Sequence, residues 1–343
     1  MAGLGSRFSK LGFTNIKPLI PLNGKTFIEW SVESVDFNSI ETQFIFVILE
    51  EHRTILENHL KKIKPNCIIE SVKCLTQGAV ETALAASNHI NNDIPLIITN
   101  SDQIFEWNKE KYIDYLQKTD TDADVVIVNA NSKKFSYILL NEYNNGVKLA
   151  EKEIISDNAL VGIHYWKKGK YFVTSGIELM KQNIRSNNEF YISLSYNILI
   201  NTGIHVTAYK LDAAEKYLSI GTPEQVYDYL NYKGLNVEIY NLTNFKNGWI
   251  IGDFEPSILK NTGVEMAVMK KTKGIHKNDF HYHEHCIEIN VLIKGKMKMN
   301  DKIINENEIF VYNPFVPSIC EFLEDSTFVV FKNKPSNKDK VIM

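Results

Sequence analysis

Two segments near the start of the chain carry residues that could bind phosphate. The first is GLGSR, which contains Gly3, Gly5, Ser6 and Arg7, and the second is IKPLIPLNGK, which contains Lys17. Small residues let backbone N–H groups approach phosphate oxygens, and an arginine can bind these oxygens through two hydrogen bonds. A lysine beside them can neutralise charge that develops on a phosphorus under attack. Taken alone, a short glycine pair is equally typical of a structural turn.

A carboxylate further along the chain could supply a metal ligand. Asp102 lies in ITNSDQ, directly after an apolar run that we expect to form a buried strand. Ligands of open α/β sheets collect outside the carboxyl ends of the strands. A carboxylate there suits Mg²⁺, which accepts one or two carboxylates together with phosphate oxygens. The alternative is an Asx turn or a helix cap at Ser101–Asp102.

A third candidate site lies in HYHEH, towards the other end of the chain. His281 and His283 alternate, so on a strand their side chains share one face, and Glu288 can join them from a neighbouring strand. Two imidazoles and a carboxylate suit a transition metal such as Zn²⁺, Fe²⁺, Mn²⁺ or Ni²⁺. His285 continues the alternation and could act as a substitute ligand.

Residues 1–232 alternate short apolar runs with helix-like stretches. Because such runs are typical of strands buried on both faces, we expect a parallel sheet covered by helices. The segment 137–166 is expected to be a mixed hairpin insertion with its turn at Asn144-Asn145-Gly146. The expected strands are 44–49, 67–72, 94–99 and 125–130, and the expected helices are 52–63, 79–90, 176–187 and 223–232.

The pattern changes after about residue 233. Short runs rich in Val, Ile, Phe and Met, such as IEINVLIKG and FVVFKN, are separated by frequent turns. This pattern predicts an all-β sandwich or barrel of the double-sheet type. We therefore expect an α/β domain over residues 1–235 and an all-β domain over residues 246–343. The length of 343 residues agrees with two domains, since a domain averages roughly 150 residues.

The composition disfavours several classes of protein. With 38 basic and 41 acidic residues the net charge is −3, so a general role in binding nucleic acid or an anionic membrane is not expected. No apolar run reaches the roughly 18 residues needed to span a bilayer, and we expect a cytoplasmic protein. The 4 cysteines show no CxxC pairing, which favours reduced thiols over a disulfide framework or a zinc site.

Several motifs occur in an order that resembles one enzyme family. They are MAGLGSRF with IKPLIPLNGKT, TQGAVETAL, TNSDQ, AEKEIISDNALVGIHYW, NEFYISLSYN and GTPEQV. Together they resemble the sugar-phosphate nucleotidyltransferases, whose core is a GT-A-like Rossmann fold with a mixed or parallel sheet. The family transfers a nucleoside monophosphate from a nucleoside triphosphate to a phosphorylated sugar, or sometimes to phosphocholine, and releases pyrophosphate. The resemblance covers nearly all of residues 1–232.

The resemblance implies which residues bind the nucleotide. It makes the residues of GLGSR the triphosphate loop and puts Lys17 between the nucleotide and acceptor phosphates. Asp102 becomes the Mg²⁺ ligand, and we expect Arg7, Lys17 and Asp102 to take part in catalysis. Gln77 and Gly78 fall where the family reads the nucleobase, with Thr82 nearby. Gln77 could equally be a surface residue that caps the next helix.

The resemblance also implies which residues bind the acceptor. Glu151 and Lys152 match a Glu-Lys pair that holds the acceptor, with Lys152 on its phosphate, and Gly162 matches a backbone contact in the following strand. Outside this ordered set, Glu151-Lys152 would be interpreted as an exposed charged pair in a loop.

One position departs from the pattern of many thymidylyl- and related transferases. They carry a second metal-binding aspartate two residues before the glycine of the GT motif, and this chain has Ser219 there. A neutral serine is a poor Mg²⁺ ligand. Either the metal relies on Asp102, phosphates and water, or another acid such as Asp212 or Glu224 helps.

The spacing of His281, His283, Glu288 and Gly295 resembles the first cupin motif, and EIFVYNPFVPS resembles the second. The all-β domain is therefore expected to be a cupin jelly roll, of the kind that accompanies nucleotidyltransferases of surface-polysaccharide synthesis. Metal-binding cupins have a further histidine where this chain has Ser318. Many cupins bind no metal and hold a sugar or an acid inside the barrel, so both interpretations stay open.

The leading hypothesis is an Mg²⁺-dependent nucleotidyltransferase that activates a sugar phosphate, or a similar small phosphate ester, for capsule or surface-glycan synthesis. TQGAVET favours CTP as the nucleotide. One alternative is a bifunctional enzyme whose cupin isomerises or epimerises the same sugar. The other is a transferase weakened at Ser219 that carries a cupin for ligand sensing or for homo-oligomerisation.

The glycine-rich motif begins at Met1, although such loops normally follow a buried strand. We therefore expect the natural chain to start upstream of Met1, or this version to be less stable than an extended one.

Overall fold

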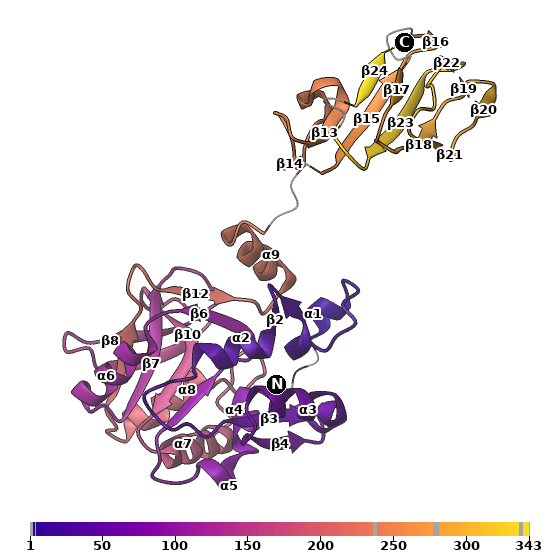
Figure 1. The fold of residues 1–343 in the computed structure, drawn as a ribbon. Helices are drawn as coiled ribbons and strands as arrows, with labels where there is room; N and C mark the ends of the chain where they lie inside the picture. Colours follow the sequence, from indigo (N-terminus) through magenta and orange to yellow (C-terminus); the bar gives the residue numbers. More distant parts are fainter. Residues whose placement is uncertain are drawn as a thin grey trace. The chain divides into compact units, whose positions relative to one another are not determined.

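The computed structural model describes residue 3 and residues 5–235, 239–261, 263–276, 281–335 and 339–342. The chain divides into two compact units, Met1–Asn236 and Val237–Met343 (Figure 1). Among the described residues, none of the helices combines the length and the apolar character that crossing a bilayer requires.

The first unit is built on a mixed β-sheet. Its strands follow the order β11-β7-β10-β8-β9, and β5 also pairs with β10. β7 and β11 are parallel, whereas β10 runs antiparallel to β5, β7 and β8. The bounds are β5 (Leu96–Thr99), β7 (Ala123–Asn129), β8 (Ser136–Leu140), β9 (Gly146–Glu151), β10 (Asn158–Trp166) and β11 (Val206–Lys210).

The sheet confirms the predicted Rossmann-like α/β fold, and of the two predicted forms, mixed or parallel, the sheet is the mixed one. Parallel neighbours need a crossover connection, usually a helix. No helix lies between β7 and β10, a stretch that the structure describes throughout, so β10 pairs antiparallel with β7. The apolar runs do not reveal strand direction, because buried strands of either direction have the same composition.

Shorter strand pairs surround this sheet. β3 and β4 are parallel, and β6 and β12 are antiparallel, as are β1 and β2. Their bounds are β1 (Pro21–Leu22), β2 (Lys25–Thr26), β3 (Ile45–Leu49), β4 (Ile68–Val72), β6 (Gln103–Glu106) and β12 (Lys216–Ser219).

The helices agree with the sequence pattern in part. The helix predicted over 223–232 is observed with the same bounds. The stretch 79–90, predicted as one helix, forms two. The bounds of the predicted helix 176–187 are wrong, because the observed helix runs from Gly169 to Lys181 and the backbone turns left-handed at Asn183. The helices of the first unit are α1 (Ser6–Ser9), η1 (Lys17–Leu19), α2 (Phe27–Ser34), η2 (Glu50–His52), α3 (Arg53–Ile63), α4 (Ala79–Leu84), α5 (Ser87–Ile90), α6 (Lys109–Thr119), α7 (Gly169–Lys181), α8 (Ile192–Asn201) and α9 (Pro223–Tyr232).

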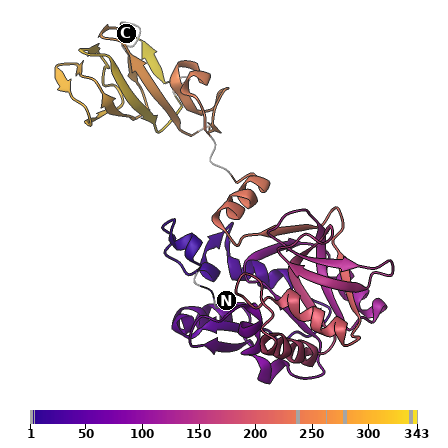
Figure 2. The ribbon, with the colours of Figure 1, turned by 180° about the vertical axis from the view of Figure 1, so that it is seen from behind.

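Helices cover the sheet on both faces. Val125 and Ile127 of β7 belong to the same buried cluster as α7 and α8, which lie side by side (Figures 1 and 2). Val126, whose side chain points the other way, packs in a second cluster with Tyr112 and Leu116 of α6. Because helices cover both faces of this sheet, side chains on both faces of its strands are buried. The strands are therefore nearly continuous hydrophobic runs.

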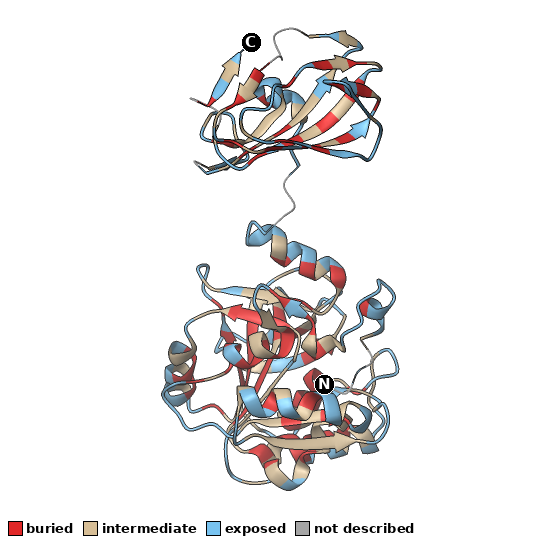
Figure 3. Cartoon of the chain, turned by 45° about the vertical axis from the view of Figure 1, so that its right-hand side comes forward, coloured by how far each residue is buried: buried red, intermediate tan, exposed pale blue. Residues whose placement is uncertain are grey.

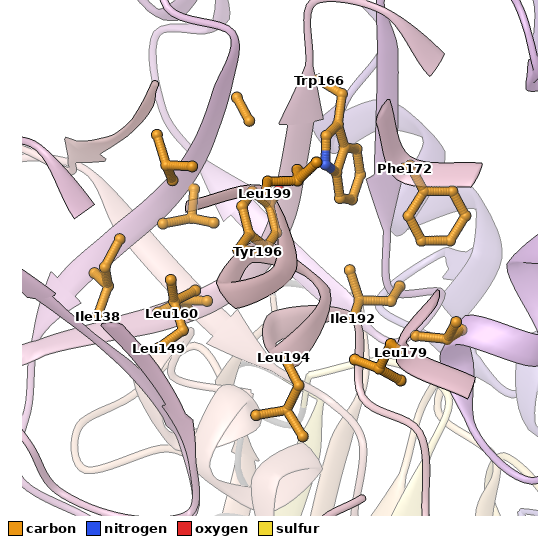
Figure 4. Close-up of a cluster of buried hydrophobic side chains, with 14 of the residues drawn as sticks. Ile138, Leu149, Leu160, Trp166, Phe172, Leu179, Ile192, Leu194, Tyr196 and Leu199 are labelled. Atoms are coloured by element: carbon orange, nitrogen blue, oxygen red, sulfur yellow. The ribbon is translucent and has the colours of Figure 1, made fainter. Parts of the chain in front are cut away.

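Aromatic rings fix the end of β10 against α7 and α8. Trp166 lies 4.9 Å from the ring of Phe172 and 5.0 Å from the ring of Tyr196, measured between centroids (Figure 4). All three side chains are fully buried. This packing anchors α8, and with it the segment just before α8 that contributes to the candidate site.

The second unit consists of strands in two larger sheets and one strand pair. The sheet orders are β14-β13-β15-β23-β18-β21, β16-β22-β19-β20 and β17-β24. The bounds are η3 (Leu242–Asn244), η4 (Lys246–Gly248), β13 (Trp249–Gly252), β14 (Leu259–Lys260), β15 (Glu265–Lys271), β16 (Gly274–Ile275), β17 (His281–His283), β18 (Glu288–Lys294), β19 (Met297–Met299), β20 (Lys302–Ile304), β21 (Ile309–Tyr312), β22 (Cys320–Phe322), β23 (Ser326–Lys332) and β24 (Lys340–Ile342).

Side chains of these strands alternate between the interior and the surface (Figure 3). Leu292, Met297, Phe310, Phe322 and Val330 form the apolar core. Because the period is 2, the residues at neighbouring inward positions must also be buried, whatever their polarity. Glu288, Asn290 and Lys332 occupy such positions.

Candidate active site and a buried polar centre

The first unit brings Lys17 and Asp102 together. Lys17 begins η1, Asp102 lies in the bend between β5 and β6, and Lys17 Nζ is 2.5 Å from Asp102 Oδ2. Both side chains keep about a quarter of their surface exposed, at 22% and 28%. A charge pair that solvent can reach is also within reach of a phosphate or a cation.

Glycines on two sides allow close approach to this pair. A Cβ at Gly5 would lie 2.8 Å from Lys17 Cβ, and Gly5 has a left-handed backbone with φ +60°. A Cβ at Gly221 would lie 3.0 Å from Asp102 Oδ2, while the backbone N–H of Ile220 donates to the carbonyl of Asp102 at 2.9 Å. The GLGSR segment and the GTPEQV segment therefore border the pair from opposite ends of the unit's sequence.

Arg7 and Ser6 follow Gly5 at the beginning of α1, and both are exposed. The guanidinium of Arg7 makes no hydrogen bond or ion pair with any residue that the structure describes. Gly3 is exposed, and nothing described lies within 4 Å of a Cβ placed on it.

The alternatives for a second acidic ligand differ in where they lie. Ser219 stands opposite Gln103 in the β12–β6 register, so its neighbour in sequence, Ile220, reaches Asp102. Asp212 is paired instead with Lys111 of α6. Within the described part of the first unit, no three His, Cys, Asp or Glu side chains bring their ligand atoms within 4.8 Å of one another. A single carboxylate at Asp102 is compatible with Mg²⁺, which takes its other ligands from phosphates and water.

Gln77 and Gly78 pack against the chain just before α8. A Cβ at Gly78 would lie 2.4 Å from the backbone N of Phe190, and that N–H donates to the carbonyl of Gln77 at 2.8 Å. Gly78 has φ +140°, so both its backbone angle and this contact require glycine. The hydroxyl of Thr82 lies 2.6 Å from that of Thr76 and donates to the carbonyl of Gly78, which closes the turn.

Arg185, which the sequence analysis did not single out, holds the side chain of Gln77. Its Nη2 donates to Gln77 Oε1 at 2.7 Å, and its guanidinium stacks 3.9 Å from the centroid of the Phe190 ring. An arginine can only donate, so the atom of Gln77 that it meets must be the carbonyl oxygen. The amide nitrogen of Gln77 makes no hydrogen bond with the described residues.

Glu151 ends β9 and Lys152 follows it; a serine of α8 holds Glu151, and Tyr191, just before α8, holds Lys152. Glu151 Oε2 accepts a hydrogen bond from Ser193 at 2.8 Å and one from Ser136. Lys152 Nζ donates to the hydroxyl of Tyr191 at 2.8 Å, and this hydrogen bond raises the pKa of Lys152, which stays positively charged. Lys152 has φ +57°, an unusual backbone for a non-glycine residue and one found often at functional sites.

Gly162 lies against the turn that carries Asp102. A Cβ at Gly162 would lie 2.2 Å from Asn100 Nδ2 and 2.8 Å from Gln103 Oε1. Asn100 and Gln103 also bond to its carbonyl, through a backbone N–H at 3.3 Å and an amide N–H at 3.2 Å. The left-handed backbone of Gly162 thus lets β10 approach the turn that carries Asp102.

The second unit contains a cavity of about 100 Å³ between its sheets. Its walls are mostly apolar, and its polar lining comprises His281, Glu288, Asn290, Tyr312, Ser318, Lys271, Lys332 and Lys340. His281, His283 and Glu288, which the sequence pattern groups together, are all buried with their ligand atoms within 4.8 Å of one another. His285 is exposed and belongs to no such cluster, so the prediction that it substitutes as a ligand is wrong.

Two residues distant in sequence complete this polar centre. Asp339 Oδ2 lies 3.2 Å from His283 Nδ1, while His283 Nε2 lies 3.3 Å from Glu288 Oε2. Lys332 Nζ lies 3.4 Å from the same oxygen of Glu288. Burial raises the pKa of Glu288, but the hydrogen bond from His283 and the charge of Lys332 outweigh this and lower it to about 2.

The donor set does not fit a divalent metal ion well. Two imidazoles and a carboxylate are suitable ligands, but the carboxylate already faces a buried ammonium. A metal ion bound to Glu288 would be repelled by Lys332 at short range and low dielectric constant. Ser318, at the position of the missing histidine, donates instead to the hydroxyl of Tyr312 at 3.2 Å.

Comparison with known proteins agrees with the fold of the first unit. Residues 1–228 match the protein family described as Nucleotidyl transferase. The chain is 25% identical over 175 residues to the bifunctional protein GlmU of Methanocaldococcus jannaschii, covering 49% of this chain and 38% of that protein. It is 26% identical over 273 residues to the GlmU of Methanococcus aeolicus, covering 78% and 58%. The chain therefore spans well under two thirds of the length of these curated relatives.

Solved structures share the same architecture. A nucleoside-diphosphate-sugar pyrophosphorylase from Vibrio cholerae superposes with a TM-score of 0.60 at 22% identity, covering 67% of this chain and 98% of that one. An inositol-1-phosphate CTP transferase from T. maritima superposes with a TM-score of 0.55 at 16% identity, covering 69% and 95%. At these identities the likeness establishes the fold.

Proposed function

The chain belongs to the nucleotidyl transferase family, and its first unit is a nucleotidyltransferase; we propose that it transfers a nucleoside monophosphate from a nucleoside triphosphate to a sugar phosphate or a similar small phosphate ester. The observation that carries this proposal is the contact of Lys17 with Asp102 beside Gly5. This contact joins a glycine-rich loop, a lysine ammonium and a carboxylate at one solvent-reachable point.

The reaction needs positioning and charge neutralisation more than a general base. An oxygen of the acceptor phosphate forms a bond to the α-phosphorus, the bond from this phosphorus to the bridging oxygen breaks, and pyrophosphate leaves with the electron pair. Backbone N–H groups of Gly3, Gly5, Ser6 and Arg7 and the guanidinium of Arg7 would bind the triphosphate. Lys17 would neutralise the charge that develops at the α-phosphorus, since its ammonium is held beside Asp102. Mg²⁺ held by Asp102 would supply a further positive charge to the phosphates.

Lys152 and Glu151 would bind the acceptor. The ammonium of Lys152 is held by Tyr191 and would pair with the acceptor phosphate. Glu151 has one oxygen occupied by serine hydroxyls, which leaves the other available for a hydroxyl of the sugar. Gly162, the third acceptor residue that the resemblance implies, contacts Asn100 and Gln103 in the turn of Asp102.

The geometry of Gln77 favours CTP. Arg185 occupies the amide oxygen of Gln77, so its amino group is the part left to read a base. Cytosine offers two adjacent acceptors, N3 and O2, whereas uracil and thymine offer the acceptors O2 and O4 on either side of a donor, N3–H. Gln77, Gly78 and Thr82 form one turn, and this turn contacts the segment that carries Tyr191.

The wider role is proposed on the sequence resemblance alone. We place the reaction in the cytoplasm and in the synthesis of capsule or surface polysaccharide, and we propose that residues 246–343 form a cupin domain. Two larger β-sheets around an interior cavity support the cupin assignment.

A panel of substrates tests the transferase proposal. Release of pyrophosphate is measured with CTP, UTP, GTP and dTTP, each against several hexose 1-phosphates, inositol 1-phosphate and phosphocholine. We expect turnover that requires Mg²⁺, is fastest with CTP and is lost in Asp102→Asn. Full turnover in Asp102→Asn would exclude this site, and absence of turnover with every pair would exclude the proposed reaction.

A further inference from the structure

A second group of possible metal ligands lies beside His283, and it does not include His281 or Glu288. It consists of His283 of β17, Cys286 in the connection to β18 and Asp339 just before β24. All three residues are buried, Cys286 completely, and their ligand atoms lie within 4.8 Å of one another. The fold thus brings an imidazole, a thiol and a carboxylate together in the interior of the second unit.

The two ring nitrogens of His283 have different surroundings. Nε2 is hydrogen-bonded to Glu288 Oε2 at 3.3 Å, whereas Nδ1 is buried and makes no hydrogen bond with any residue that the structure describes. An ionised carboxylate can only accept, so Nε2 carries a proton, and Nδ1 of a neutral ring keeps its lone pair. Metal-binding histidines commonly donate their other N–H to a carboxylate in this way.

The position of Asp339 relative to Nδ1 fits a shared metal ion. In a tetrahedral zinc site with bonds of about 2.0–2.1 Å, a nitrogen and an oxygen ligand lie roughly 3.3 Å apart without bonding to each other. Asp339 Oδ2 is 3.2 Å from His283 Nδ1. A protonated His283 between two carboxylates would have the same spacing, and the metal content of the protein distinguishes the two.

Asp339 is held in place by the chain that carries Cys286. Its Oδ1 accepts from the backbone N–H of His285 at 2.6 Å, and its Oδ2 accepts from that of Cys286 at 2.9 Å. A carboxylate oxygen can accept twice, so Oδ2 keeps a lone pair for a metal ion. The thiol of Cys286 lies 3.4 Å from the carbonyl oxygen of Ile287 and 3.7 Å from that of Lys334. Because a thiol is a weak donor, these contacts compete little with a metal ion.

The charges around this group balance when a divalent ion is present. The charges of Glu288 and Lys332 cancel each other. The thiolate of Cys286 and the carboxylate of Asp339 carry two negative charges, which a divalent ion neutralises. A buried charge needs such compensation. In the group of His281, His283 and Glu288, by contrast, the ion would bind the carboxylate that Lys332 already neutralises.

We propose that His283 Nδ1, Cys286 Sγ and Asp339 Oδ2 bind one Zn²⁺ ion, with a water molecule as the fourth ligand. The thiol of Cys286 releases its proton to solvent when the ion binds, and Glu288 orients the ring of His283. A thiolate ligand selects zinc over Mg²⁺, Ca²⁺ and Mn²⁺, which prefer oxygen ligands. The ion connects β17 and the chain after it to the segment before β24, and its role is structural.

Zinc binding by the full chain tests this site. Protein purified without an affinity tag is loaded with Zn²⁺, dialysed and analysed for zinc, and its affinity is measured by competition with a chromophoric chelator. We expect about one ion per chain in the wild type and in His281→Asn, and an affinity at least about tenfold lower in Cys286→Ser and Asp339→Asn. Cys74→Ser removes an exposed thiol of the first unit and is the matched control, which should bind zinc as the wild type does.

Cobalt identifies the sulfur ligand. The wild type loaded with Co²⁺ should show a sulfur-to-metal charge-transfer band in the near ultraviolet and the strong visible bands of tetrahedral cobalt, and Cys286→Ser should lose the charge-transfer band. A wild type that binds no zinc, or whose cobalt spectrum has no such band, would overturn the proposal even if the variants fail to fold. Loss of the ion in His281→Asn with retention in Cys286→Ser would also overturn it, because the ion would then belong to His281, His283 and Glu288.

Thermal unfolding tests the structural role of the ion. Removal of zinc with EDTA should lower the melting temperature of the wild type and leave that of Cys286→Ser unchanged, because an ion that binds only the folded state stabilises it. Equal melting temperatures of the wild type with and without zinc would exclude the structural role.

Discussion

Each unit contains a lysine paired with a carboxylate, and the two pairs differ in almost every other respect. Lys17 and Asp102 are 2.5 Å apart and keep 22% and 28% of their side-chain surface exposed. Lys332 and Glu288 are 3.4 Å apart and keep 4% and 9%. In the first pair, Lys17 can exchange Asp102 for a phosphate, and Asp102 can exchange Lys17 for a cation, because solvent reaches both. The second pair is enclosed by strands, so its two charges interact with each other and not with ligands from solvent.

A third carboxylate, that of Asp124, has hydroxyl groups as partners in place of a lysine. Asp124 on β7 is fully buried and accepts hydrogen bonds from neutral hydroxyls, Thr207 at 2.7 Å and Tyr112 at 3.1 Å. Burial raises the pKa of Asp124 to about 7 against the effect of these hydrogen bonds. The pKa of Glu288, which is nearly as well buried, is lowered to about 2. For Glu288, the hydrogen bond from His283 and the charge of Lys332 therefore outweigh the effect of burial on the pKa.

Removal of one member of the buried pair should have the largest effect. Lys332→Met leaves Glu288 buried without its ammonium, and we expect the free energy of unfolding to fall by about 3–5 kcal/mol. Urea denaturation followed by tryptophan fluorescence measures this. The double variant Lys332→Met/Glu288→Gln should recover part of the loss, since no unpaired charge remains. A double variant no more stable than Lys332→Met would contradict the view that the unpaired charge of Glu288 causes the loss of stability.

The exposed pair should instead affect activity. Lys17→Met is expected to lower kcat by about 10²–10³-fold, the usual cost of losing one group that stabilises the transition state. Stability should change by less than about 1 kcal/mol, because the pair is solvent-reachable. Lys25→Met is the matched control, as the side chain of Lys25 is 41% exposed and pairs with Glu33. Equal activity of the two variants would show that Lys17 is not part of the catalytic machinery.

Asp124 should make the first unit less stable as pH rises. Its pKa is about 7 in the folded state, whereas the ordinary pKa of an aspartate in an unfolded chain is 3.8, so between these values the folded state binds more protons. The contribution of Asp124 is complete below pH 3.8 and is lost as pH rises through 7. We expect a loss of about 2.5 kcal/mol between about pH 5 and pH 7.5. Asp124→Asn should remove this dependence, and an unchanged pH profile in that variant would contradict it.

The smallest effect is expected at Arg185. Arg185→Leu frees the amide of Gln77 to rotate and present its oxygen to N3–H of uracil. We expect the ratio of kcat/KM for CTP to that for UTP to fall by about fivefold, roughly 1 kcal/mol, with kcat for CTP little changed. Arg185→Lys, which keeps a donor, should retain part of the preference. A uniform loss with both nucleotides would indicate a structural role only.

Much of the first unit could be predicted because its motifs are local. The apolar runs and helix signals identify β3, β4 and α9, and the spacing around Asp102 is visible in a short window. The partners of these residues are not local. Lys17 meets Asp102 across 85 residues, and Arg185 meets Gln77 across 108. No pattern within one segment determines such contacts, which depend on strand order and direction.

In the second unit the sequence revealed the histidines but not their neighbours. Lys332 continues the inward positions of Phe328 and Val330 in FVVFK, so alternation alone could have marked it as buried. Asp339 gives no such signal, because it lies outside any strand and reaches His283 only through the pairing of β17 with β24. The histidine spacing pointed to candidate ligands, whereas the ammonium of Lys332 beside Glu288 became visible only in the structure.

The stretch before α8 touches both parts of the candidate active site. The backbone of Phe190 holds Gln77 and Gly78, and the next residue, Tyr191, holds Lys152. A shift of this stretch on nucleotide binding must therefore move the acceptor residues as well. The two substrates would then change each other's affinity by one common factor, whichever binds first. Equal acceptor dissociation constants with and without a non-hydrolysable nucleotide would show that this stretch does not couple the two binding sites.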